Sequence, residues 1–171
     1  MRRCGCTWAL LLVLCGLYGC GPSLRMPRQS GDGIALRLLD RNLETLQFAL
    51  FVLEDENTLS GSGGLDARNN TVSWSLTLND AEVSQLHKAI RNAGWLKGEA
   101  KGESDAAPGP RMLIIRVGGK EGSQAFTIEA VGLKFGPETT AVLDLLSAFS
   151  RRRFKDTLDL LPSSGDSGRG R

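Results

Sequence analysis

Cysteine and histidine, which often carry metal-binding and nucleophilic chemistry, are scarce in this chain of 171 residues. All four cysteines lie at or before position 20, and His87 is the single histidine. The chain after residue 20 therefore has no disulfide framework, no cysteine-based zinc site and no cysteine nucleophile. Because one histidine alone makes no metal site, we expect neither a bound metal nor a cofactor.

The chain also lacks an excess of charge of either sign. Its 21 basic and 19 acidic residues give a formal net charge of +2. A domain that binds nucleic acid normally carries a clearly positive charge that is gathered on one face. We therefore expect no nucleic-acid partner.

No apolar run is long enough for a permanent transmembrane helix. A hydrocarbon core of about 30 Å needs roughly 20 helical residues. The run from Trp8 to Tyr18 is about half as long and ends at Gly19 and Pro22. Since Arg2 and Arg3 precede it, residues 1–19 are predicted to be an export signal peptide that is removed.

The end of this run, Leu17-Tyr18-Gly19-Cys20, resembles the lipobox of bacterial lipoproteins. Leu17 lies three positions before the cysteine and the small Gly19 directly before it, whereas Tyr18 is larger than this family usually has. The resemblance implies cleavage after Gly19 and attachment of diacylglycerol and fatty acid, such as palmitate, at Cys20. It also implies a membrane-anchored protein of the cell envelope, with its domain on the exported, periplasmic or extracellular, side.

Composition divides the rest of the chain into three segments. Residues 20–33 are rich in Pro, Ser and Gly and have no hydrophobic period, which predicts a flexible tether. Residues 163–171 consist of Ser, Gly, Asp and Arg, which predicts a disordered tail. Residues 34–162 between them are enough for a single domain with its own core.

Alternating apolar and polar residues predict the strands of this domain. The pattern is clearest from Thr71 to Leu78, where one face carries Val72, Trp74, Leu76 and Leu78. The leucines from Leu36 to Leu53 also fit a helical spacing, but the apolar residues between them favour a strand buried on both faces. Further strands are predicted at 46–53, 58–67, 112–117 and 125–131, with an additional one at 34–39.

Two helices are predicted from their starting signals. Asn79-Asp80-Ala81-Glu82 matches a capping box, and Gly94 would end that helix. Pro137 suits the first turn of the second helix, which we expect to end near Arg151-Arg152-Arg153. The order β-β-β-α-β-β-α predicts an α+β domain, in which both helices pack on one face of an antiparallel sheet of five or six strands.

No motif points to catalysis. The glycine-rich segments match neither a phosphate-binding loop nor a dinucleotide-binding fingerprint, and there is no G-x-S-x-G turn. His87 borders the apolar face of the first helix, so we interpret it as a packing residue. The cluster Arg151–Arg153 is interpreted as stabilising the negative end of the second helix, with contact to anionic headgroups as the alternative.

These patterns predict a lipid-anchored envelope protein whose domain is a non-catalytic binding or assembly module. Its partners would be the membrane, through acylated Cys20, and an unidentified envelope protein or wall component. Such a module should present a shallow surface with an apolar patch or an unpaired strand edge. The alternative is an envelope hydrolase that uses dispersed Asp and Glu residues, with two carboxylates about 5–9.5 Å apart in one cleft.

Overall fold

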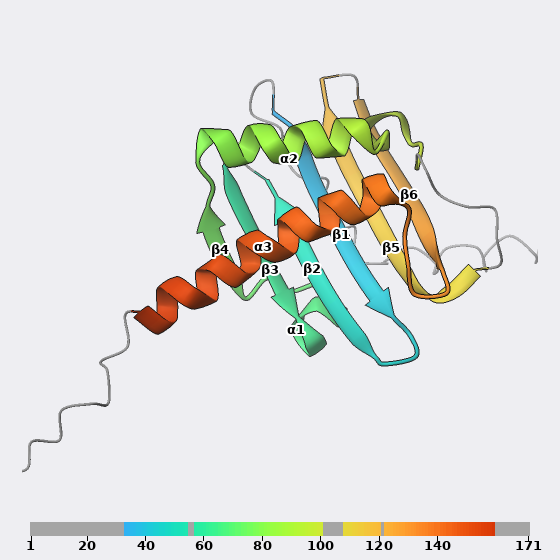
Figure 1. Cartoon of the computed structure of the whole chain (residues 1–171), viewed down its shortest axis with the longest axis horizontal. Coiled ribbons are helices and arrows are strands. Elements are labelled where there is room, and N and C mark those ends of the chain that lie inside the picture. The colour runs from blue at the N-terminus through green and yellow to red at the C-terminus, as the bar shows by residue number, and fades with distance from the viewer. Residues whose placement is uncertain (1–32, 55–56, 101–107, 121, 160–171) are drawn as a thin grey trace, which may run out of the picture.

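The computed structural model describes residues 33–54, 57–100, 108–120 and 122–159 (Figure 1). Leu17, Gly19 and Cys20 lie outside the described residues, as do nearly all of the expected tether and the whole of the expected tail. The same holds for residues 101–107.

Within these described residues, the domain is built on one antiparallel sheet of six strands in the order β4-β3-β2-β1-β5-β6. β2 and β3 follow β1 as a meander, with β4 beside β3, and the β5–β6 hairpin lies on the other side of β1. β1, the first strand in the described part of the chain, therefore joins two halves of the sheet. The strands are β1 (Ala35–Asn42), β2 (Gln47–Leu53), β3 (Thr58–Gly63), β4 (Trp74–Thr77), β5 (Pro108–Gly119) and β6 (Gly122–Val131).

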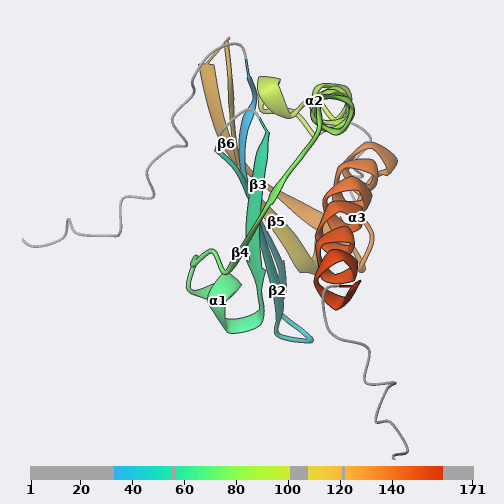
Figure 2. The ribbon, with the colours of Figure 1, turned by 90° about the vertical axis from the view of Figure 1, so that its left-hand side faces the viewer.

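The two long helices, α2 (Asp80–Asn92) and α3 (Pro137–Asp159), cover one face of the sheet. Figure 2 shows the sheet edge-on, with these helices on one side and the short α1 (Gly64–Arg68) on the other. The predicted α+β class and the placement of both expected helices on one face are confirmed. The additional strand is also confirmed, since residues 34–39 fall almost entirely within β1.

The main core lies between the sheet and the two long helices. It combines central-strand residues and the inner faces of the helices with Trp95 of the short 3₁₀ helix η1 (Trp95–Lys97), which follows Gly94. Its fully buried members include Leu36, Leu38, Leu113, Ile115, Leu86, Ile90, Val142 and Leu146. On the other face, Leu50 and Val52 of β2 form a smaller cluster with Ala67 of α1. Strand β2 is therefore buried on both faces, as the sequence predicts.

The capping box at the start of α2 is formed as predicted. The side chain of Asn79 accepts a hydrogen bond from the N–H of Glu82 at 3.0 Å, and the Glu82 carboxylate accepts one from the N–H of Asn79 at 2.9 Å. Gly94 follows the helix with a φ of 78°, in the left-handed region. Both ends of α2 thus follow from local sequence signals.

Two strand boundaries differ from the prediction. The strand expected over 58–67 ends at Gly63, because Gly64 has a φ of 58° and turns the chain into α1. The strand expected from Thr71 begins only at Trp74, so Val72 is exposed rather than part of the core. In both places a turn shortens a strand whose residue pattern continues beyond it.

Among the described residues, no helix combines the length and the apolar character that a membrane span requires.

Candidate ligand-binding site on the open face of the sheet

A hollow of about 430 Å³ lies on the face of the sheet opposite α2 and α3. On this face α1 packs against β2 and β3 (Figure 2). The residues that line the hollow belong to β1, β2, β5 and α1 with the turn that follows it. We call it the arginine hollow. Three arginines, two asparagines and three apolar residues line it: Arg37, Arg68, Arg116, Asn69, Asn70, Leu39, Leu50 and Ile114.

Strand register arranges the floor of the arginine hollow in two rows. Arg37 of β1 lies directly opposite Arg116 of β5, and we call this pair the arginine rung. Leu39 lies opposite Leu50 of β2 on one side and Ile114 of β5 on the other, and these three form the apolar rung. Residues two positions apart on a strand share a face, so the two rungs lie side by side.

The turn after α1 holds the guanidinium of Arg37 in place. Its Nε and Nη2 donate to Oδ1 of Asn70 at 3.2 and 2.7 Å, and Nη2 also donates to the Asn70 carbonyl at 3.1 Å. Asn70 has a φ of 63°, and its N–H donates to the Ala67 carbonyl at 3.0 Å. This turn, with its positive φ, therefore orients an arginine of the hollow.

Charges of both signs act on Arg37. Burial lowers the pKa of Arg37 below its ordinary value, Glu54 raises it, and Arg116 lowers it by less than Glu54 raises it. Arginine stays charged at neutral pH. Because arginine is well suited to bind carboxylate or phosphate in a bidentate way, the two guanidinium groups of the rung can hold an anion.

The chemistry of the arginine hollow is that of binding. Its lining residues include no Asp, Glu, His, Cys, Ser or Thr, so the lining offers neither a nucleophile nor a general base. In the described part of the chain, no three His, Cys, Asp or Glu side chains are grouped closely enough to hold a metal ion. His87 lies half-buried on α2, on the other side of the sheet.

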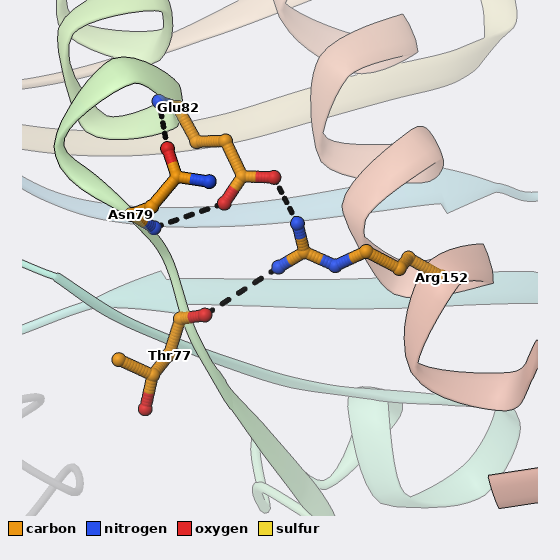
Figure 3. Close-up of polar contacts among 4 residues, drawn as sticks. All are labelled: Thr77, Asn79, Glu82 and Arg152. Carbon is orange, nitrogen blue, oxygen red and sulfur yellow. Dashed lines mark hydrogen bonds and ion pairs between the residues drawn. The ribbon is translucent and has the colours of Figure 1, made fainter. Parts of the chain in front are cut away.

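The basic cluster Arg151–Arg153 does not end a helix, and this prediction was wrong. α3 continues to Asp159, which leaves the cluster more than one turn from the end, beyond the reach of the helix dipole. Arg152 instead donates to the carboxylate of Glu82, and to the carbonyl of Thr77 at 3.4 Å (Figure 3). The guanidinium of Arg153 lies 5.6 Å from the ring centre of Trp74. Two of the three arginines therefore make contacts that connect α3 to α2 and β4.

Sequence reasoning missed the arginines of the hollow. Arg37 and Arg116 are each a single charge within an otherwise apolar strand segment, and this was the available signal. This signal does not predict that the two arginines lie opposite each other, because the register between strands that are far apart in sequence cannot be predicted from either strand alone. Neither the models of known protein families nor the curated proteins match this chain, so its function is inferred from the geometry of the arginine hollow.

Proposed function

We propose that this protein is a lipid-anchored component of the cell envelope whose domain binds an anionic envelope component without transforming it. The observation that carries the proposal is the arginine hollow, where an arginine rung and an apolar rung share an open sheet face. Its volume of about 430 Å³ falls within the range of about 300–1,000 Å³ that is typical of small-ligand sites. The resemblance of residues 17–20 to a lipobox supports the anchor.

The arginine hollow gives no support to the alternative of a hydrolase, because no carboxylate lines it. A second hollow, near the β1–β2 turn, contains one carboxylate, that of Asp40. This carboxylate accepts from Nε and Nη2 of Arg111 at 3.0 and 2.6 Å. The hydrogen bond from Arg111 to Asp40 raises the pKa of this arginine, so its guanidinium stays charged. A carboxylate held in such a pair is poorly placed to act as an acid or base.

One experiment in cells tests the anchor and the binding face together. A photoreactive residue replaces Thr127, which is exposed and lies opposite Ile114 on β6. A matched variant carries it at Lys88, which is exposed on α2 on the other side of the sheet. Cells that express either variant are fed a fatty-acid probe and then irradiated.

We expect fatty-acid labelling that is lost in Cys20→Ala and retained in Cys15→Ala. We also expect the Thr127 variant to form adducts that Arg116→Gln reduces, and the Lys88 variant to form none that depend on Arg116. Equal labelling of wild type and Cys20→Ala would refute the anchor. Adducts that are insensitive to Arg116→Gln would refute binding at the arginine hollow.

A further inference from the structure

We infer that the ligand of the arginine hollow is a single-chain lipid anion, with one phosphate or carboxylate group joined to an apolar chain. This inference rests on the proposed function and specifies its ligand class. It follows from the arrangement of two chemically different rungs within one hollow. Neither rung alone would select such a molecule.

The anionic group is assigned to the arginine rung. Arg37 and Arg116 face each other across β1 and β5, and Arg68 adds a third positive charge from the last turn of α1. The bonds from Arg37 to Asn70 use Nε and Nη2. Nη1 makes no hydrogen bond among the described residues, so its two hydrogens can reach a ligand. A guanidinium that is already oriented loses less side-chain entropy when it binds.

The apolar chain is assigned to the apolar rung. Same-face residues on neighbouring rungs lie about 7 Å apart, so a chain attached to a headgroup at Arg37 extends over Leu39. Leu39 and Ile114 are partly exposed there, while Leu50 is fully buried below the floor. Covering partly exposed apolar side chains contributes favourable free energy in proportion to the area removed from water.

Simpler ligands leave one rung unused. Inorganic phosphate would neutralise the arginine rung but leave Leu39 and Ile114 in water. A neutral lipid would cover the apolar rung but would offer the guanidinium groups of the arginine rung no anionic group to bind. Only a ligand with both parts satisfies both rungs of a hollow of about 430 Å³.

Titration calorimetry with three probes tests this assignment. The protein is the full chain with Cys20→Ala, which keeps every described residue and removes the proposed acylation. The probes are octyl phosphate, inorganic phosphate and octanol, which present both parts, the headgroup alone and the chain alone. The variants are Arg116→Gln, Arg68→Gln and Leu39→Asn, and Arg151→Gln serves as control because it is exposed on α3 across the sheet.

We expect one octyl phosphate per chain, with inorganic phosphate and octanol each binding at least about tenfold more weakly. Arg116→Gln and Arg68→Gln should each weaken octyl phosphate by about tenfold, since charge-assisted hydrogen bonds are lost. Arg68 is exposed, so its substitution leaves the core intact. Leu39→Asn should reduce the advantage of octyl phosphate over inorganic phosphate, and Arg151→Gln should change nothing.

The inference is overturned if octyl phosphate fails to bind, if it binds no better than inorganic phosphate, or if Arg151→Gln weakens it as much as Arg116→Gln does. Any of these results would contradict a lipid ligand. If cross-links from Thr127 still depended on Arg116, the proposed binding function would nevertheless be retained. Cross-links from Thr127 that do not depend on Arg116 would contradict both the lipid ligand and binding at the arginine hollow.

Discussion

Arginine has two different roles in this domain, and they depend on what lies opposite the guanidinium. Arg111 and Arg152 each meet a carboxylate, that of Asp40 and that of Glu82. Arg37 instead has Arg116 directly opposite across the strands. The first arrangement joins opposite charges and stabilises the fold, whereas the second places two like charges on one face of the sheet, where an anionic ligand can contact both.

The stabilising role is testable at Arg152. Arg152→Ala removes the bonds to Glu82 and to the Thr77 carbonyl, which connect α3 to α2 and to the end of β4 (Figure 3). We expect a loss of about 1–2 kcal/mol in the free energy of unfolding, because the pair is only partly exposed. Urea denaturation of wild type, both single variants and Glu82→Ala/Arg152→Ala gives the coupling energy.

The matched control for this cycle is Arg151→Ala, which is exposed and should shift the unfolding free energy by no more than about 0.5 kcal/mol. Additive effects of the two substitutions at Glu82 and Arg152 would contradict a direct interaction between these side chains. Equal losses at Arg151 and Arg152 would point to helix propensity as the cause.

An element of this domain can be predicted from sequence when the interactions that form it are local. α2 was predicted with both ends because its capping box and its glycine stop are local. α1 was missed, since five residues carry too short a pattern and Gly64 turns the chain only in the folded context. The end of α3 was misplaced because Arg152 and Arg153 are engaged by distant elements rather than by the helix terminus.

The arrangement of β3 between β2 and β4 depends on a glycine. A Cβ atom at Gly61 would lie 2.5 Å from Cζ2 of Trp74 and would also clash with the Leu50 carbonyl oxygen. Trp74 packs edge-on against Phe51, with ring centres 6.2 Å apart, so it has little room to move. We expect Gly61→Ala to destabilise the domain by about 1–3 kcal/mol, the usual cost of overpacking, as measured by urea denaturation.

Gly63→Ala provides the comparison on the same strand. Its nearest neighbour in that direction is the Phe48 carbonyl oxygen at 3.9 Å, and its φ of −129° suits any residue. We expect a change within about 0.5 kcal/mol. If both alanine variants lose the same stability, the loss comes from glycine replacement in general and not from the contact with Trp74.

At the scale of the whole molecule, the fold class could be predicted and the candidate site could not. Alternation and capping signals repeat along the chain and fix the number and type of elements, which was enough for an α+β sheet with helices on one face. The arginine hollow takes residues from β1, α1 and β5, which come together only through strand order and register. Those quantities depend on the packing of the whole domain, because a shift of one residue would send Arg116 to the other face.

Residues 34–162 should fold as one cooperative unit, because a single core joins both halves of the sheet to both long helices. Trp74 lies on β4 and Trp95 beside the β5–β6 hairpin, so each reports on one half. We expect this fragment, carrying either Trp74→Phe or Trp95→Phe, to give urea transitions that coincide with far-UV circular dichroism. Separate transitions for the two tryptophans, or aggregation of the fragment, would contradict a single domain.

The central position of β1 also has a consequence for synthesis. β1 is the first strand to be made, but its second partner, β5, begins only at Pro108, after β2, β3, β4 and α2. Until β5 has been made, the edge of β1 that pairs with β5 lacks this partner strand. The newly made N-terminal half therefore exposes an apolar strand edge, the kind of surface that pairs with other chains, and the β5–β6 hairpin is the segment that closes it.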